Sequence, residues 1–537
     1  MSILAVSADF PTLADALAGA LDGDTITLAA GSYTEDVSLG GRSLTLSGAG
    51  SGSTILTATS LGIDATGGGT VTLSGLTVRN GARGIDSTAD LTLTDVILTG
   101  LGDGTEDGAS LRQIGGALTW TGGSLDYGEG ANGNVYLEST TAAFDSVDIQ
   151  YSSAAYGGGV YALDSAVSLV AVGLVRNEAT EDGGGLWMSG GTLLFDGGGV
   201  VASVAGVHGA GFYALDAEVA IANTTFEQSV AGSYGGAVWQ TGGTLAVEGS
   251  AFTDNTAWSI ADVDTIGMDA VELRNTTFAE WTATEGRCSI GCSVYIQSGE
   301  AVLDALGWED ATGDLAAWVQ LTSTLEVGDL SVSTSVGDEI TVRAYVYGDT
   351  TVAGTWILDN GDVAINVTAP ATMTLGPLHI EGGDVGLYGA AGTFTDLTSI
   401  DTRLTLYGAT ITNMSMTGGT MRLEGDTSIT DLEMDDANMV LASNGSDLAF
   451  TDVRIHDVAG VPAIEVERGD IVFDGLSVVD GTGGGLSIAG GTVTFHQAYF
   501  GGNSATNGGA IAMESGALEV TAGVFFDNTA TDNGGAA

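Results

Sequence analysis

Five aromatic residues recur at nearly constant spacing and are the residues best suited to binding chemistry. The column consists of Tyr136, Tyr161, Trp187, Tyr213 and Trp239, whose sequence numbers rise in steps of 25, 26, 26 and 26. Flat tyrosine and tryptophan rings suit stacking on a sugar or packing against a protein partner. The column therefore predicts one of two arrangements. Either the ring faces point outward and form a binding face, or the rings stack on one another beneath a loop and only stiffen the chain.

Acidic loops are a second set of candidate ligands. The loop from Gly102 to Gly108 carries three carboxylates, on Asp103, Glu106 and Asp107. Carboxylate and carbonyl oxygens of this kind are what Ca²⁺ prefers. The loop lacks the spacing of an EF-hand or of a nonapeptide calcium repeat, so solvated turns compete with a calcium site. We expect no cofactor, with Ca²⁺ as the open alternative.

The two cysteines of the chain, Cys288 and Cys292, lie close together in the sequence. No second cysteine pair or nearby histidine completes a zinc site. The spacing favours a small local disulfide in an oxidising compartment, and two free thiols remain the alternative.

The elements that carry these residues repeat with a period near 26. Two apolar columns share that period: Val160, Leu186, Phe212 and Val238 directly precede the aromatic residues, and Leu174, Val200, Phe226, Phe252 and Phe278 form the second column. Between turns of Gly, Asn and Asp, apolar residues alternate with small or polar ones, which is typical of short strands. About three strands per repeat, stacked in parallel about 4.8 Å apart, make one coil of a solenoid. The sequence predicts an all-β, single-stranded right-handed parallel β-helix of about 21 coils.

Four segments are expected along this β-helix. Residues 1–30 form a cap and first coil, with a short helix whose apolar face holds Leu13, Ala16, Leu17, Ala20 and Leu21. Residues 31–255 form coils that keep the period near 26. Residues 256–350, with the cysteine pair, are expected to be irregular and to carry insertions. Residues 351–537 are expected to narrow near 380–450, where the steps between Leu387, Leu406, Leu423 and Leu441 are 19, 17 and 18, and to end in an uncapped coil that a longer chain or another molecule covers.

The net charge excludes one class of partner. The chain has 68 acidic residues against 12 basic ones, all of them arginine, and a formal charge of −56. Such a surface repels nucleic acid and anionic lipid. No apolar run reaches the roughly 18 residues that a membrane-spanning helix needs. We therefore expect neither a nucleic-acid-binding nor a membrane-spanning protein.

A Phe-x-x-Asn motif recurs with Gly-Gly-Ala-aliphatic. Examples are Phe252 to Asn255, Gly235 to Val238, and Phe500 to Asn503 with Gly508 to Ile511. The phenylalanine is expected to fill a core corner, and the asparagine to adopt a left-handed conformation while bonding to neighbouring coils. These repeats resemble those of the polymorphic outer membrane proteins, which are adhesin passengers of the autotransporter kind. The opening, from Asp22-Gly23-Asp24 to Gly31-x-Tyr33-x-Glu35, resembles the entry of pectin-lyase-like β-helices. The resemblance implies a surface-exposed adhesive β-helix.

Enzymatic signatures are fragmentary. Polysaccharide hydrolases of the pectin-lyase-like kind need clustered carboxylates, and Asp435-Asp436 is the sole Asp-Asp pair in the sequence. Val207-His208-Gly209 and Arg454-Ile455-His456 are partial matches to catalytic motifs of that family. Lyases with the same fold use a basic residue beside a calcium-binding cluster, and the twelve scattered arginines do not single one out. We expect no enzymatic activity, with a polysaccharide lyase or hydrolase as the alternative.

The function that these observations predict is a non-catalytic structural or adhesive β-helix that is extracellular or displayed on the cell surface. Its expected partners are a glycan or protein of a host or neighbouring cell, or further copies of itself. A carbohydrate-binding or carbohydrate-cleaving β-helix is one alternative. A subunit of a homotypic filament or layer, assembling through the uncapped end, is the other.

Overall fold

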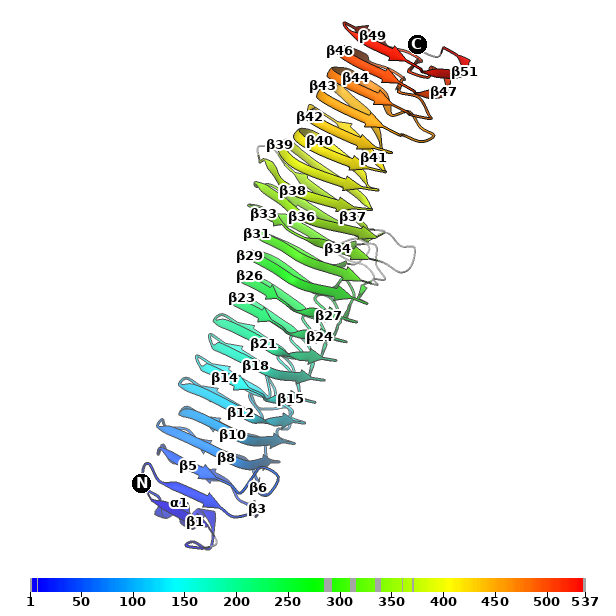
Figure 1. Ribbon diagram of the computed structural model, residues 1–537. Helices are drawn as coiled ribbons and strands as arrows, with labels where there is room; N and C mark the ends of the chain where they lie inside the picture. Colours follow the sequence, from blue (N-terminus) through cyan, green and yellow to red (C-terminus); the bar gives the residue numbers. More distant parts are fainter. Residues whose placement is uncertain are drawn as a thin grey trace. The chain divides into compact units, whose positions relative to one another are not determined.

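The fold is seen in a computed structural model, which describes residues 2–6, 8–283, 292–309, 315–333, 340–359, 361–368 and 371–534. These residues form an all-β, right-handed parallel β-helix of about 21 turns with one short helix (Figure 1). The predicted fold class is confirmed. The chain divides into two compact units, the first comprising residues 1–297 and the second residues 298–310 and 314–537.

The N-terminal cap is the helix α1 (Leu13–Gly19). The Thr12 hydroxyl accepts a hydrogen bond from the Asp15 backbone N–H at 3.1 Å and begins the helix, and Leu13, Ala16 and Leu17 are buried. The helix ends at Gly19, so Leu21 lies beyond it and is 72% exposed. The placement of Leu21 on the apolar face was therefore wrong. The strand β1 (Ile3–Val6) precedes the helix in the chain. It pairs with β2 (Thr25–Leu28), which follows the helix.

Two rows of strands form most of the first unit. The first row is short and carries the aromatic column: β7 (Leu61–Ala65), β9 (Arg83–Ser87), β11 (Leu111–Ile114), β13 (Val135–Glu138), β17 (Val160–Leu163), β20 (Leu186–Ser189), β23 (Phe212–Ala222), β26 (Val238–Glu248) and β29 (Ile260–Ala279). The second row is longer: β8 (Thr70–Arg79), β10 (Asp90–Thr99), β12 (Ala117–Asp126), β14 (Thr141–Asp145) with β15 (Asp148–Gln150), β18 (Ala166–Val175) and β21 (Thr192–Val201), after which β23, β26 and β29 run through both rows.

A third row of very short strands lies in six successive coils and includes β19 (Glu178–Ala179), β22 (Val204–Ala205), β25 (Val230–Ala231) and β28 (Thr256–Ala257). Ala179, Ala205, Ala231 and Ala257 point inward at this corner and are buried. Small side chains are needed here because the coils turn sharply and little space remains for the core.

The two predicted apolar columns lie in the core. Val160 pairs with Leu186, Leu186 with Phe212 and Phe212 with Val238, and all four are at most 3% exposed. In the other column the Phe226 and Phe252 rings stack at 4.8 Å and 4°, and the Phe252 and Phe278 rings at 5.1 Å and 19°. An increment of 26 in sequence number is therefore one step between neighbouring coils.

Asn255 links coils as expected but not in the expected conformation. Its Oδ1 accepts a hydrogen bond from the Ser229 backbone N–H, and its Nδ2 donates to the Phe226 carbonyl, both at 3.0 Å. The left-handed residue is the preceding Asp254, with φ 55°. The asparagine side chain thus satisfies buried backbone groups, and its neighbour makes the turn.

The second unit has narrower coils in its middle part. There β39 (Asp384–Ile400), β40 (Arg403–Thr417), β41 (Thr420–Glu424) with β42 (Thr427–Asp435), and β43 (Asn438–His456) follow one another. Leu387 pairs with Leu406, Leu406 with Leu423 and Leu423 with Leu441. Coils widen again towards β44 (Ile464–Val479), β45 (Leu486–Ile488), β46 (Thr492–Gly501) and β48 (Ile511–Met513), where Leu486 pairs with Ile511.

In the segment expected to be irregular, 256–350, the described strands pair in parallel, with register shifts where β29 pairs with β26 and where β32 (Leu315–Leu321) pairs with β35 (Ile340–Val346). In the first unit β29 keeps the register of β27 (Ala251–Thr253), so that Phe252 lies beside Phe278. In the second, Leu306 pairs with Leu330 and Leu330 with Trp356. Residues 284–291, 310–314 and 334–339 are outside the described residues. The described strands keep parallel pairing because a buried apolar residue at every second position fixes the register.

Candidate binding surface

The five aromatic residues stack on one another. In chain order the ring centroids are 5.4, 4.3, 6.1 and 4.5 Å apart, with interplanar angles of 12°, 3°, 9° and 7°, for Tyr136, Tyr161, Trp187, Tyr213 and Trp239. Four of the five side chains are 8 or 9% exposed, and Tyr161 is partly exposed. The hypothesis of exposed ring faces is therefore wrong, because each ring covers the face of the next.

A second layer of side chains covers the edges of this stack. Tyr156 and Tyr234 pack against it. The His208 imidazole lies 5.3 Å from the Trp239 ring and 5.6 Å from the Tyr234 ring. Asp182 fixes His208, because one of its carboxylate oxygens lies 2.9 Å from Nδ1 and 3.0 Å from the backbone nitrogen. The alternation of inward and outward side chains along a strand predicts that the five residues point away from the core. It could not reveal that Tyr156, His208 and Tyr234 cover them.

The tyrosines of the stack are poor acids at neutral pH. Burial, with the nearby Glu138 carboxylate, raises the pKa of Tyr136 to about 12. Burial, with Asp182, likewise raises the pKa of Tyr213 to about 12. The Tyr136 hydroxyl lies 3.1 Å from a Glu138 oxygen and donates to it. Both phenols therefore stay protonated at neutral pH.

Charged residues continue the aromatic column at its N-terminal end. Arg112 pairs with Tyr136 in the sheet and Asp86 with Arg112. The Arg112 guanidinium lies 3.1 Å from the Asp86 carboxylate, and Arg83 contacts Asp86 at 3.0 Å and Glu106 at 2.7 Å. Both arginines next to the stack are thus held by carboxylates.

The carboxylates of the acidic loop are held apart from one another by separate partners. Asp103 accepts hydrogen bonds from the Thr105 hydroxyl and backbone, which lower the pKa of Asp103. Glu106 binds Arg83, and Asp107 accepts from the Asn132 amide at 2.9 Å. In the described part of the chain, the one group with oxygen and nitrogen ligands close enough for a metal ion lies elsewhere. One local turn partner and two partners from neighbouring coils thus bind the three carboxylates, and a calcium site at this loop stays a prediction.

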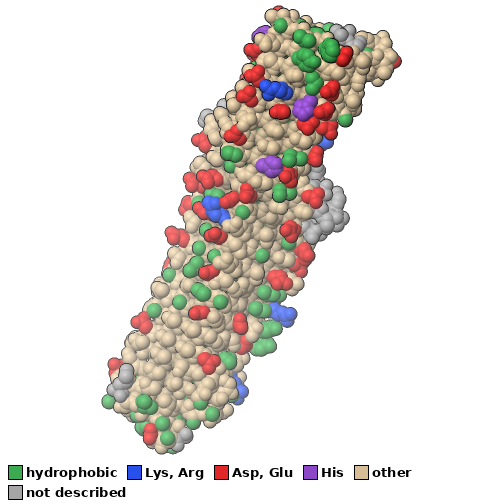
Figure 2. All heavy atoms as spheres, viewed as in Figure 1, with side chains coloured by type: hydrophobic (Ala, Val, Ile, Leu, Met, Phe, Trp, Pro, Cys, Tyr) green, Lys and Arg blue, Asp and Glu red, His purple; other side chains and the backbone are tan. Residues whose placement is uncertain are grey.

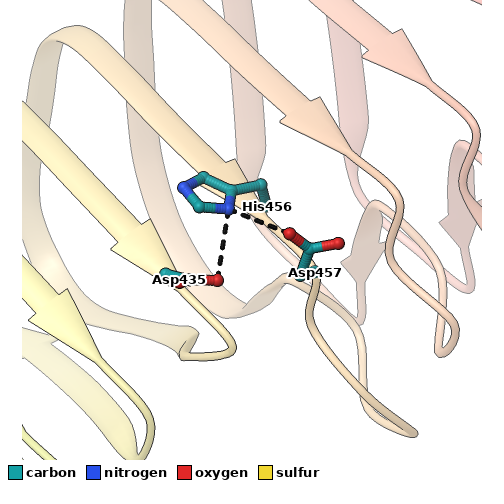
Figure 3. A group of neighbouring side chains, drawn as sticks. All are labelled: Asp435, His456 and Asp457. Atoms are coloured by element: carbon teal, nitrogen blue, oxygen red, sulfur yellow. Dashed lines mark hydrogen bonds and ion pairs between the residues drawn. The ribbon is translucent and has the colours of Figure 1, made fainter.

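That group consists of Asp435, His456 and Asp457, at the ends of β42 and β43 in the second unit (Figure 3). His456 Nδ1 lies 3.2 Å from a carboxylate oxygen of each aspartate, and Nε2 lies 3.8 Å from Glu433. Asp435 and His456 are paired residues in neighbouring strands. The sequence held both in separate partial motifs, and their juxtaposition follows from the register between these two coils.

Acidic side chains are spread over the face drawn in Figure 2, with few arginines among them. A hollow of about 480 Å³ in the first unit is lined mainly by small side chains of β14, β18, β21 and β23, with the half-exposed Leu194 among them. It contains one ionisable residue, Glu218.

Cys292 begins β31 (Cys292–Glu309) and is buried, while Cys288 lies outside the described residues. Cys292 is disulfide-bonded, as the sequence favoured.

Exposed aromatic residues that the period of 26 did not reveal lie at another corner of the first unit. Tyr127 and Tyr151 are 61% and 39% exposed, and their rings stack at 5.0 Å and 12°. The Arg176 guanidinium lies 5.8 Å from the centre of the Tyr151 ring. The steps of 24 and 25 between these three positions, rather than 26, hid them among the unequal early coils.

No helix in the described residues is long and apolar enough to cross a membrane.

The similarity between this chain and known proteins is weak. No protein-family model matches it, and no curated protein does. Among solved structures, the PL6 family alginate lyase AlyGC aligns with 99% of this chain and 100% of its own, at 10% identity and a TM-score of 0.25. An arginine-to-alanine mutant of that enzyme aligns over the same shares at 11% identity and a TM-score of 0.23. Such values carry no argument about activity, and no family model supports the resemblance to polymorphic outer membrane proteins. The chain is a parallel β-solenoid, and its function has to be argued from its own surface.

Proposed function

We propose that this protein is a non-catalytic, extracellular β-helix that adheres by its surface to a glycan or protein of another cell. The observation that carries the proposal is the neutralisation of the charged groups beside the aromatic stack. Arg83 and Arg112 converge on Asp86, and Glu106 takes the remaining face of Arg83. A lyase base must be free to accept a proton from substrate, and arginines paired in this way already donate to carboxylates.

The tyrosine chemistry supports the same reading. Tyr136 and Tyr213, whose pKa values lie near 12, neither accept a proton nor release one readily at neutral pH. The stack also excludes a sugar ring from the space between its members, since adjacent rings already contact one another. What remains is a long, regular and acidic surface, which suits recognition over many coils better than catalysis in a cleft.

The proposal is tested by measuring binding and turnover on the same sample. The full chain is applied to an array of neutral and acidic oligosaccharides. It is then incubated with alginate, polygalacturonate and neutral polysaccharides while absorbance of unsaturated products and release of reducing ends are followed. We expect binding with no product above the buffer control. Product formation that scales with protein concentration would overturn the proposal.

Carbohydrate cleavage is the second candidate, and the Asp435–His456–Asp457 group is the observation that favours it. A histidine held by a carboxylate can act as a general acid or base. His456 is partly exposed and therefore accessible to a substrate. If turnover is detected, His456→Gln should abolish it, whereas His379→Gln, which changes the exposed His379–Glu381 pair, should not.

A further inference from the structure

One corner of the first unit is built from residues in the left-handed conformation. In nine successive coils, the residue that directly follows the end of the second row of strands has φ between 52° and 59°. These residues are Asn80, Gly100, Tyr127, Tyr151, Arg176, Ala202, Gln228, Asp254 and Glu280. Asn, Gly and Asp adopt this conformation readily, whereas it is strained for a bulky residue such as tyrosine. Two successive tyrosines at such a corner therefore call for an explanation beyond the turn itself.

The tyrosine side chains form an exposed stack with a defined order. Gln150 pairs with Asp126 in the sheet, so Tyr127 and Tyr151, which follow them, are adjacent at the corner. Their rings lie nearly parallel, 5.0 Å apart, and Arg176 lies against Tyr151 from the next coil. The stack is thus closed at the Arg176 end.

The other end of the stack faces a glycine. Thr99 pairs with Asp126, which places Gly100 beside Tyr127, and Thr99 also pairs with Arg79, which places Asn80 beside Gly100. A Cβ atom at Gly100 would meet a single neighbour within 4 Å, the Asn80 Oδ1 atom at 3.9 Å. Gly100 thus leaves open space beside Tyr127, which is 61% exposed.

The missing side chain leaves a slot between Asn80 and Tyr127. Two coil steps of about 4.8 Å separate these residues, or about 9.6 Å. One flat ring placed midway lies at about the distance that separates the Tyr127 and Tyr151 rings, 5.0 Å. The slot thus has an aromatic wall on one side, an amide on the other and room for one ring.

We propose that Asn80, Gly100 and Tyr127 form a binding slot for one pyranose ring of an uncharged glycan. The C–H face of the sugar packs on the Tyr127 ring, as apolar groups do on aromatic faces. The Asn80 amide, with two donors and an acceptor, bonds to hydroxyl groups at the sugar edge. A nucleotide ring also fits by shape, but the net charge of −56 repels its phosphates. The inference rests on the proposed adhesive function and deepens it by naming the ligand class.

The test fills or removes the slot in the full chain. Gly100→Tyr places in the slot the side chain that the same corner already accommodates at φ 53° at Tyr127 and Tyr151, so we expect the coil to accept it despite the strain at φ 58°. Tyr127→Ala removes the aromatic wall. Binding of each protein to neutral gluco-, galacto-, manno- and N-acetylglucosamine-configured oligosaccharides is measured by array and then by calorimetry on the best binder. Both variants should lower affinity for that oligosaccharide at least about tenfold.

Two matched controls separate the slot from general damage. Gln228→Tyr adds a tyrosine at the same corner five coils beyond Gly100, at φ 56°, and Tyr407→Ala removes a tyrosine that is 48% exposed in the second unit. Both should bind as the unchanged protein does. If the unchanged protein binds an oligosaccharide and Gly100→Tyr and Tyr127→Ala bind it equally well, the slot proposal is wrong. The proposed adhesive function is not affected by that result. Absence of binding to every neutral oligosaccharide also overturns the slot, and cleavage of the bound glycan would instead overturn the proposed function.

Discussion

The side-chain amide of Asn255 donates a hydrogen bond to Oδ1 of Asp262 at 2.9 Å, within the core of the first unit. The Ser293 hydroxyl donates to the other carboxylate oxygen at 2.6 Å. Asp262 is fully buried, and no arginine is among these partners. Burial outweighs the two hydrogen bonds and raises the pKa of Asp262 from 3.8 to about 7.

This carboxyl group should make stability depend on pH. The folded chain holds the Asp262 proton between about pH 4 and pH 7, whereas an unfolded chain has released it, so the free energy of unfolding falls as pH rises through this window. The loss is on the order of 4 kcal/mol. Asp262→Asn removes the titration; its amide oxygen can still accept from Asn255, and its amide nitrogen can donate to the Ser293 hydroxyl in place of accepting from it. We expect the variant to unfold at higher urea than the unchanged protein at pH 8 and at a similar concentration at pH 4, with unfolding followed by tryptophan fluorescence. Equal midpoints at both pH values would contradict a raised pKa.

The phenylalanine column should carry local stability. Phe252 is fully buried and stacked on both sides, so Phe252→Ala should cost about 3 to 5 kcal/mol through lost contacts and a cavity. Because a coil contacts only its neighbours, the loss should be confined to strands near β27. Hydrogen exchange followed by mass spectrometry measures it peptide by peptide. Phe526→Ala, at a side chain that is 59% exposed, is the control and should change protection little. Uniform loss of protection over the whole chain would contradict nearest-neighbour coupling.

The aromatic stack should prove structural rather than ligand-binding. Trp187→Ala removes a ring that lies 4.3 Å from Tyr161 and 6.1 Å from Tyr213, and should reduce protection of β17, β20 and β23. Trp187→Phe should restore most of that protection. Neither change should alter oligosaccharide affinity, in contrast to Tyr127→Ala. If Trp187→Phe keeps the fold but no longer binds the oligosaccharide, the aromatic stack is a binding face and this prediction is wrong.

These expectations show what the repeat in the sequence could predict. Spacing alone identified Leu186 and Phe212 as neighbours, because a solenoid converts a constant period into adjacency. Spacing could not show that His208 and Tyr234 cover the outer side of the same strands, since alternation reports only which side of a strand a residue leaves. It also missed the corner of Tyr127, because the sequence number rises by 27 from Gly100 to Tyr127 and by 24 from there to the next tyrosine of the corner. Unequal coils hide adjacency that the backbone pairing reveals.

An ion pair should stabilise the narrow coils of the second unit. Arg422 in β41 reaches past β43 to Glu467 in β44 and contacts both carboxylate oxygens, at 3.0 and 2.9 Å, while its Nε donates to Glu424 at 2.7 Å. These bonds lower the pKa of Glu467, chiefly through the hydrogen bond from Arg422. A lowered carboxyl pKa contributes stability above the unfolded pKa, and that stability is lost as pH falls through the folded pKa.

Arg422→Gln should therefore destabilise the second unit at pH 7 by about 1 kcal/mol, a value limited by the partial exposure of both partners. The difference from the unchanged protein should shrink as pH falls below about 4, where Glu467 becomes protonated in the unfolded chain and then in the folded one. Hydrogen exchange of β41 and β44 at pH 7 and pH 3, corrected for intrinsic rates, measures both values. Arg403→Gln is the matched control, since Arg403 contacts Asp384 at 2.8 Å but is 69% exposed and its removal should cost less than about 0.5 kcal/mol. A loss at Arg422 that persists unchanged at pH 3 would mean that its aliphatic stem, rather than its charge, links the two coils.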